Sequence, residues 1–269
     1  MTSQGYQLIA TGPEKYLELA VRCAASIKHW DPRRRIQLLT DATSEQLAQY
    51  KELFDDITPY ENEHEFLGPM IKLQMFDYAI YSETMFVDAD CLILKGDMDL
   101  YWDSLSESYD VAVPGEWKSD GEWYGMEISD MCKLAKIDKL VKMNSGVLYF
   151  RKNEVAESFF NTAKGLFRNL GNFANHIHRG LGPADEPYLA LAFGVNGLNP
   201  FPIHDDKGNG WMISTIGSSE HNMDAFSGSP SFVKGGMISP TISHFIGLSP
   251  LPIYEKLCNQ FLSAAKIGG

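Results

Sequence analysis

Apolar positions in the first half of the chain recur with two different periods, which indicates short strands alternating with helices. Continuous apolar runs predict strands over residues 6–11, 36–40, 57–60 and 84–87. Apolar side chains spaced three and four residues apart predict intervening helices over residues 13–27, 44–54 and 70–80. Strands joined by helices of this length form parallel βαβ units with right-handed crossovers. The pattern therefore predicts an α/β fold with a mainly parallel central sheet flanked by helices.

The second half of the chain has a less regular pattern. Strands are predicted over residues 111–114, 147–150 and 241–245, an amphipathic helix over residues 155–170, and a terminal helix over residues 253–265. Residues 194–236 are rich in Gly, Pro, Asn and Ser and are expected to form loops, as substrate-binding segments often do. Because no linker or internal repeat divides the chain, we expect one mixed α/β domain over residues 1–269.

Charge and composition narrow the range of partners. The formal net charge is −12, with 35 acidic against 23 basic residues, and no long basic run is present. Nucleic-acid binding, which needs a basic footprint, is therefore not expected. The widely spaced Cys23, Cys91, Cys132 and Cys258 indicate a reducing compartment rather than a disulfide framework. With no signal peptide and no apolar stretch long enough for a bilayer, we expect a soluble cytoplasmic protein.

The most informative chemistry is the acidic pair Asp88 and Asp90, which directly follows the predicted strand 84–87. In an open parallel sheet, ligands bind beyond the carboxyl ends of the strands. Alternation along an extended segment places the two carboxylates on one side, with Ala89 opposite. A hard divalent cation that also grips phosphate oxygens is the natural occupant of such a pair.

Three other interpretations of the pair compete with this one. The first is an acidic turn whose carboxylates are satisfied by water or by helix N-termini. The second, a calcium loop, would need ligands at the fifth and twelfth positions and a glycine at the sixth. It fails because Leu92 and Ile93 occupy the fifth and sixth positions, although Asp99 stands at the twelfth. The third is a phosphatase of the haloacid-dehalogenase type, which is disfavoured because Leu92 stands where that class has Thr or Val. The phosphatase remains the best alternative enzyme class.

Four segments in a fixed order resemble the glycogenin and lipopolysaccharide-galactosyltransferase family. They are residues 69–94 with the D-x-D, the strand MNSGVLYF at residues 143–150, Ala184-Asp185-Glu186, and His244-Phe245-Ile246-Gly247. The resemblance implies a single GT-A domain with a mixed, mainly parallel sheet. It also implies transfer of a hexose from a nucleotide-sugar donor, UDP-linked, to a glycan or other hydroxyl acceptor, with retention of anomeric configuration.

The resemblance also implies roles for individual residues. Asp88, Asp90 and His244 would hold Mn²⁺ or Mg²⁺, and the imidazole favours Mn²⁺. Lys72 would meet the diphosphate, and Asp185 and Glu186 would lie near the reacting sugar carbon. The remaining donor contacts would come from Ala10, Thr11, Tyr16, Ala89, Asn144, Ser145, Gly146 and Gly247.

Each role has a purely structural alternative. Lys72 could be a solvated helical lysine, His244 a core histidine, and the carboxylates at positions 185 and 186 could cap a helix N-terminus. The other histidines have no comparable context and are expected in loops or on the surface: His29, His64, His176, His178, His204 and His221.

One departure from the family pattern concerns the far side of the diphosphate. Pro250 stands where the family has a lysine, and Lys207, Lys234 and Lys256 are candidate substitutes. The departure leaves open a non-catalytic nucleotide-sugar or glycan-binding module as a second function. For the acceptor, the candidate contacts are Trp117, Trp123, Tyr124, Trp211, Asp205 and Asp206.

Overall fold

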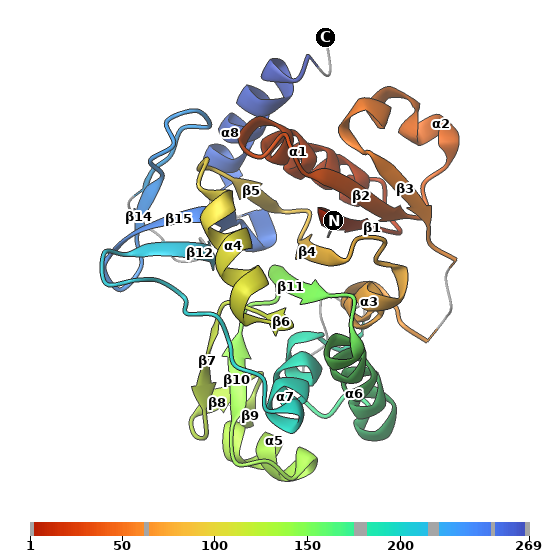
Figure 1. Cartoon of the computed structure of the whole chain (residues 1–269), viewed down its shortest axis with the longest axis vertical. Helices are drawn as coiled ribbons and strands as arrows, with labels where there is room; N and C mark the ends of the chain where they lie inside the picture. Colours follow the sequence, from red (N-terminus) through yellow and green to blue (C-terminus); the bar gives the residue numbers. More distant parts are fainter. Residues whose placement is uncertain (1–2, 62–64, 175–181, 215–220, 249–250, 267–269) are drawn as a thin grey trace.

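A six-stranded sheet forms the centre of the molecule (Figure 1), in the order β3-β2-β1-β4-β11-β6. The computed structural model describes residues 3–61, 65–174, 182–214, 221–248 and 251–266. Parallel pairing joins four strands: β1 (Gln4–Ala10), β2 (Arg35–Thr40), β3 (Asp56–Pro59) and β4 (Glu83–Val87). Strand β11 (Val147–Arg151) runs antiparallel to β4 and to β6 (Val111–Ala112). The predicted mixed and mainly parallel sheet is confirmed.

Both faces of this sheet are buried, because successive side chains of a strand point to opposite sides. Met85 and Val87 belong to one core cluster, whereas Phe86 belongs to the other. The first cluster includes buried residues of α1 (Lys15–Trp30), α4 (Met98–Ser108) and α8 (Leu251–Ala264). The second includes those of α5 (Ile128–Ala135), α6 (Glu154–Leu170) and α7 (Glu186–Asn196). Burial on both faces explains why these strands are continuous apolar runs.

A second sheet lies beside the first and carries the late part of the chain (Figure 1). Its central strand β15 (Met237–His244) pairs in parallel with β12 (Asn209–Ser214) and antiparallel with β14 (Ser231–Val233) and β5 (Cys91–Ile93). The edge strand β13 (His221–Asn222) pairs with β14. Two smaller pairs join β7 (Gly115–Lys118) to β10 (Leu140–Met143) and β8 (Glu122–Trp123) to β9 (Met126–Glu127).

Two predicted helices are shorter than expected. Residues 44–54 form α2 (Ser44–Leu47) and a 3₁₀ segment, η1 (Ala48–Leu53). Residues 70–80 form mainly a 3₁₀ segment, η2 (Gly68–Gln74), followed by the single turn α3 (Met75–Tyr78). Ile80, expected on the buried stripe of that helix, lies beyond it and is 50% exposed.

Residues 194–236, expected to be rich in loops, also contain the three strands β12, β13 and β14, which the sequence pattern did not predict. The glycines of this segment resemble those of a loop and so hid the strand β12 in the sequence. In the structure they allow the backbone of neighbouring segments to approach closely. A Cβ at Gly210 would lie 2.7 Å from the carbonyl oxygen of Ile203, and one at Gly208 would overlap the backbone of Met237. Trp211 lies in β12 with no exposed surface, so it cannot stack on an acceptor sugar.

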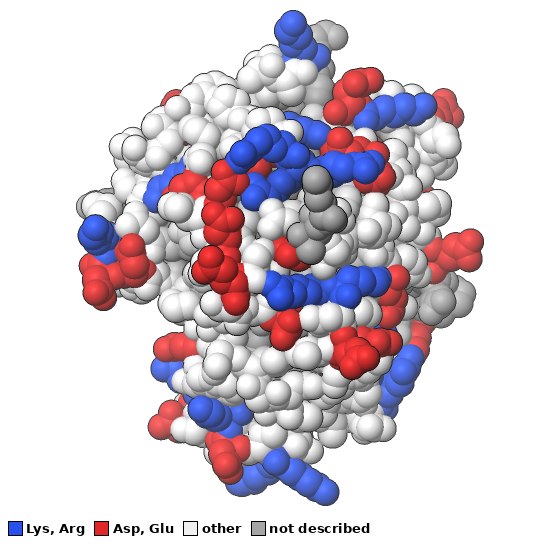
Figure 2. All heavy atoms as spheres, in the orientation of Figure 1, with Lys and Arg blue, Asp and Glu red and all other residues white. Residues whose placement is uncertain are grey.

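The surface is consistent with the composition. Figure 2 shows acidic and basic side chains interspersed on one face of the molecule, without a continuous basic stripe on that face. Within the part of the chain that the structure describes, no helix has both the length and the apolar character needed to cross a membrane. All four cysteines are buried and reduced.

Candidate active site

The carboxyl edge of the central sheet brings separate segments of the chain to Asp88. Asp88 follows the last residue of β4, and β11 begins at the same edge because it runs antiparallel, with Val147 opposite Val87. The three residues before β11 therefore lie beside Asp88, whose backbone N–H donates to the carbonyl oxygen of Gly146 at 2.8 Å. Strand pairing alone thus joins the D-x-D to Asn144, Ser145 and Gly146.

A second strand pair brings His244 to the same place. His244 ends β15 and lies opposite Cys91, the first residue of β5. Its Nε2 atom is 3.0 Å from Oδ1 of Asp90 and 3.7 Å from Oδ2 of Asp88. His244 is a buried residue at the end of a strand, as its structural alternative assumed, but its ring also faces both carboxylates.

The amide of Asn144 fixes the orientation of this imidazole. Oδ1 of Asn144 accepts a hydrogen bond from the backbone N–H of Gly146 at 3.0 Å and lies 2.7 Å from Nδ1 of His244. Because an amide oxygen can only accept, Nδ1 carries a proton, and this contact turns Nε2 toward Asp88 and Asp90. Gly146 is required here, because a Cβ at this position would lie 2.7 Å from Cε1 of His244.

Burial and the charges of neighbouring side chains shift the pKa values of His244, Asp90 and Asp88. Burial lowers the pKa of His244, but the carboxylates of Asp90 and Asp88 outweigh it and the net pKa is raised. Burial acts to raise the pKa of Asp90, yet His244 holds it below the usual range. Burial raises the pKa of Asp88 and prevails over the opposing charges of Lys72 and His244.

Asp88, Asp90 and His244 form a donor set that suits a divalent cation. Two carboxylates and an imidazole whose second nitrogen is held by an amide are typical of Mn²⁺ and related ions. Cys91 also lies within reach of Asp90 and His244. Burial and the adjacent carboxylates raise the pKa of the Cys91 thiol, so it stays protonated and is a poor ligand.

Lys72 lies inside the cluster. Its Nζ donates to Oδ2 of Asp88 at 2.7 Å and to Oγ of Ser145 at 3.1 Å, and it is 3.7 Å from Oδ2 of Asp185. Burial acts to lower the pKa of Lys72, but Asp185 and Asp88 raise it overall, so the ammonium stays charged. The alternative of a solvated lysine is wrong, because the side chain is only 14% exposed.

The carboxylates at the start of α7 point into the site rather than capping the helix. Asp185 makes no capping hydrogen bond and instead accepts from Oγ of Ser145 at 2.6 Å. Glu186 accepts from the backbone N–H of Ser145 at 3.0 Å and from the Tyr124 hydroxyl at 2.7 Å. Burial, and next the charge of Asp185, raise the pKa of Glu186 to about 7. Glu186 can therefore exchange a proton near neutral pH.

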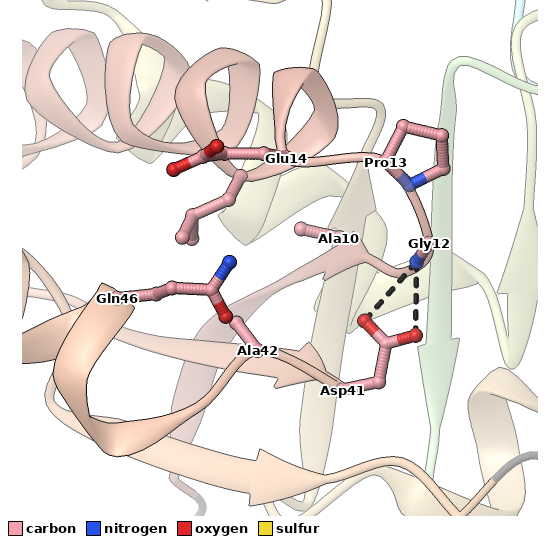
Figure 3. A pocket seen from close by; sticks show the side chains of 8 residues that line it. Ala10, Gly12, Pro13, Glu14, Asp41, Ala42 and Gln46 are labelled. Carbon is pink, nitrogen blue, oxygen red and sulfur yellow. Dashed lines mark hydrogen bonds between the residues drawn. The ribbon is translucent and has the colours of Figure 1, made fainter.

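A pocket lies on the same edge of the sheet, beyond β1 and β2 (Figure 3). Its volume is about 140 Å³, and Ala10 faces into it. The backbone N–H of Gly12 donates to both carboxylate oxygens of Asp41, at 3.1 and 2.9 Å. Gln46 and Glu14 line the side of the pocket that lies away from Gly12 and Asp41. Sequence reasoning missed Asp41, although it directly follows β2 and the rule that located Asp88 also applies to it.

The other candidates lie around this edge. Thr11 directly follows β1 and is partly exposed, as is Ala89. Tyr16 is partly buried against the core, with Nζ of Lys15 5.1 Å from its ring centre. Gly247 has a φ of 66°, a left-handed conformation that favours glycine. Contacts to substrate by these residues stay predictions.

The candidate substitutes for the missing lysine have partners elsewhere or lie on the surface. Lys234 donates to the carbonyl oxygen of Ser214, Lys256 lies 4.0 Å from Asp224, and Lys207 is exposed. Pro250 lies outside the described residues, as do His64, His176 and His178. His29, His204 and His221 are exposed, as expected.

The residues that the sequence proposed for acceptor contact differ in their exposure. Asp205 and Asp206 are exposed, and Asp205 accepts hydrogen bonds from Asn209 in its own turn. Trp117 and Trp123 are partly buried on β7 and β8.

This fold is the GT-A fold of glycosyltransferases, as comparison with solved structures shows. A complex of the galactosyltransferase LgtC with donor and acceptor sugar analogues matches 77% of this chain and 75% of its own, with a TM-score of 0.50 and 13% identity. An active-site mutant of LgtC is similar over 88% of this chain and 86% of the mutant's own chain, with a TM-score of 0.53 and 13% identity. Mouse xyloside xylosyltransferase 1 is similar over 78% of this chain and 88% of its own chain, with a TM-score of 0.47 and 11% identity. Neither a protein-family model nor a curated protein sequence matches the chain.

Proposed function

We propose that this protein is a metal-dependent glycosyltransferase that moves a hexose from a UDP-linked donor to a hydroxyl of a glycan or similar acceptor. The observation that carries the proposal is the convergence of Asp88, Asp90 and His244 beside Lys72. These groups lie on the same sheet edge as the pocket beyond β1 and β2. An anionic diphosphate needs cations beside it in this acidic surrounding. Asp88, Asp90 and His244 could hold a metal cation, and the ammonium of Lys72 is a second positive charge.

The residues of the site divide the work on the donor. The pocket next to Ala10 would take the base and ribose, with Thr11 and Tyr16 at its margin. Lys72 would hold a phosphate oxygen and stabilise negative charge as the diphosphate departs. A bound Mn²⁺ or Mg²⁺ would supply Lewis-acid assistance to the same leaving group. Asn144, Ser145 and Ala89 would contact the donor, and Gly247 would shape the late loop around it.

The carboxylates of Asp185 and Glu186 would face the sugar at the bond that breaks. Retention of anomeric configuration is part of the proposal, because the sequence motifs resemble those of retaining enzymes. In a front-face reaction the acceptor oxygen attacks the anomeric carbon on the side from which the diphosphate leaves, and the acceptor proton passes to the departing phosphate. Asp185 and Glu186 would stabilise the positive charge that develops on the sugar.

Release of UDP from a panel of UDP-sugars tests the proposal, with Mn²⁺ or with EDTA and with or without a panel of sugar acceptors. We expect Mn²⁺-dependent release in the wild type. Asp90→Asn should lose it, with an unchanged circular dichroism spectrum, because the amide keeps the shape but removes a charged ligand. Asp103→Asn, an exposed substitution on α4, is the matched control.

Different outcomes separate the alternatives. Mn²⁺-dependent UDP binding without turnover across a wide acceptor panel would favour the non-catalytic binding module. Release of phosphate from simple phosphomonoesters would favour the phosphatase, for which the observed GT-A fold gives no support. If UDP neither binds nor is released, the proposed function is wrong.

A further inference from the structure

Tyr124 occupies a backbone position that is unfavourable for a tyrosine. Strands β8 and β9 pair antiparallel, with Trp123 opposite Met126, and leave Tyr124-Gly125 as a two-residue loop. Both loop residues have positive φ, 52° for Tyr124 and 69° for Gly125. Loops of this kind favour Asn-Gly, because a left-handed backbone crowds any Cβ atom and a short polar side chain tolerates it best.

The other non-glycine residues with positive φ in the described chain have an ordinary explanation. Lys136 and Lys266 lie at helix C-termini, where a left-handed residue commonly ends the helix. Tyr124 is at no helix end. Backbone strain of this kind persists where the surrounding structure fixes it, and it gathers at functional sites. The strained conformation therefore calls for a reason in the side chain.

The side chain of Tyr124 holds one oxygen of Glu186. Its hydroxyl donates to Oε2 of Glu186 at 2.7 Å, while the backbone N–H of Ser145 donates to Oε1 at 3.0 Å. The ring packs against the second core cluster and lies 5.1 Å from the ring of Trp123. Burial and the charge of Glu186 raise the pKa of Tyr124, so the hydroxyl stays a donor. Two unconnected segments thus fix both oxygens of one carboxylate.

We propose that Tyr124 is a positioning residue that orients the Glu186 carboxylate toward the donor sugar. The inference rests on the proposed function, since it assigns the hairpin loop to the same site. Each Glu186 oxygen uses one lone pair on its protein donor and keeps another for the sugar. The contact with Glu186 gives the Tyr124 hydroxyl a role besides the acceptor contact expected from the sequence, which stays a prediction.

The charged groups around Glu186 determine what loss of the Tyr124 hydroxyl would do. Burial and the neighbouring Asp185 raise the pKa of Glu186, whereas Tyr124, Ser145 and Lys72 lower it. Removing one of the groups that stabilise the ionised form shifts the balance toward the protonated form. The pKa of Glu186 should therefore rise above about 7 in Tyr124→Phe.

Tyr124→Phe is the decisive variant, because it keeps the ring and the strained turn and removes only the hydroxyl. Loss of this hydrogen bond to a charged group should lower kcat by about ten- to a hundredfold and leave the KM for the sugar donor unchanged. The pH profile of kcat should shift to higher pH. Tyr109→Phe is the control, since the Tyr109 ring contacts Phe201 and packs on the first core cluster, whereas Tyr124 packs on the second.

A second measurement does not depend on turnover. Carbon-13 NMR of glutamate-labelled protein follows the Glu186 carboxyl through a pH titration, and Glu186→Gln assigns its signal. An unchanged Glu186 titration and an unchanged kcat in Tyr124→Phe would overturn the positioning role. If the wild type shows no transfer while the Glu186 signal still shifts in Tyr124→Phe, the orienting contact is supported and the proposed transferase function fails.

Discussion

Gly146 lies where His244, the proposed metal ligand, and its orienting amide come closest. A Cβ at this position would lie 2.7 Å from Cε1 of His244 and 2.9 Å from Oδ1 of Asn144. Gly146→Ala should therefore push the imidazole away from Asp88 and Asp90. Loss of such an orienting contact typically weakens metal binding by about 10- to 100-fold, which calorimetric titration of Mn²⁺ in the presence of UDP would measure.

The control for this change lies in α6. Gly165 has open space around its Cβ position, and Gly165→Ala adds a better helix former. It should leave Mn²⁺ affinity unchanged. Equal affinity in Gly146→Ala and Gly165→Ala would contradict the orienting role of the His244–Asn144 contact.

Glu186 makes the stability of the fold depend on pH. Its folded-state pKa is about 7, against an ordinary value of 4.5, chiefly because of burial and the charge of Asp185. An acid with a raised folded-state pKa holds its proton more tightly in the folded protein, so stability falls as pH rises between the two values. Glu186→Gln cannot ionise and should be more stable than the wild type by on the order of 3 kcal/mol well above pH 7.

Urea denaturation at two pH values tests this expectation. Below about pH 4.5 the wild-type carboxyl is protonated in both states, so the advantage of Glu186→Gln should vanish there. An advantage of the same size at pH 4.5 and pH 8 would instead indicate a change in packing.

Residue-level prediction from the sequence could place a motif in the fold where it follows the end of a strand, whereas the role of that motif stays a prediction. Asp88 and Asp90 were located in this way and His244 by the family resemblance, and the strand pairs bring the three side chains together. The contact between Tyr124 and Glu186 was not predictable, because it joins a hairpin loop to a helix start 62 residues away. No periodicity or spacing within the chain encodes such a contact.

At the scale of elements, the successful predictions share deep burial. Strands β4 and β11 have apolar residues on both faces and read as nearly continuous runs, and β1 does so apart from Gln4 and the buried Gln7. Helix α4 was missed although Met98, Trp102 and Leu105 have helical spacing, because Ser and Asp fill most of its other positions. Strand β12 was missed because its glycines, which allow close backbone approach, resemble those of a loop.

The start of α6 gives an element-scale test that leaves the site untouched. Oδ1 of Asn153 accepts from the backbone N–H of Ala156 at 3.0 Å, and its Nδ2 donates to Asp110 at 2.7 Å. Asn153→Ala removes the N-cap and should lower the free energy of unfolding by about 1 kcal/mol. Asn153→Ser keeps a capping oxygen and should lose less. Denaturant unfolding measures both variants, and a change in Mn²⁺-dependent UDP affinity would contradict the separation of α6 from the site.

At the scale of the whole molecule, the site joins parts of the chain that are distant in sequence. The pocket is built from residues between Ala10 and Gln46. The candidate metal ligands Asp88 and Asp90 lie between β4 of the first sheet and β5 of the second, and His244 ends β15. The pairing of β5 with β15 in the second sheet brings His244 beside the D-x-D segment. The order of the motifs could indicate this arrangement in advance, but the distances depend on the packing of the complete fold.

A donor that spans the pocket and the acidic cluster should therefore stabilise the whole fold. With UDP and Mn²⁺ at about 100 times the Kd, linkage predicts about 2.7 kcal/mol of added stability, a rise in Tm of several degrees. Uridine lacks the diphosphate, so any stabilisation it gives should be the same in Mn²⁺ and in EDTA. Asp90→Asn should lose the Mn²⁺-dependent part of the UDP effect and keep the uridine effect. Stabilisation by UDP that is equal in Mn²⁺ and EDTA would mean that Lys72, rather than a metal at Asp88, Asp90 and His244, carries the diphosphate.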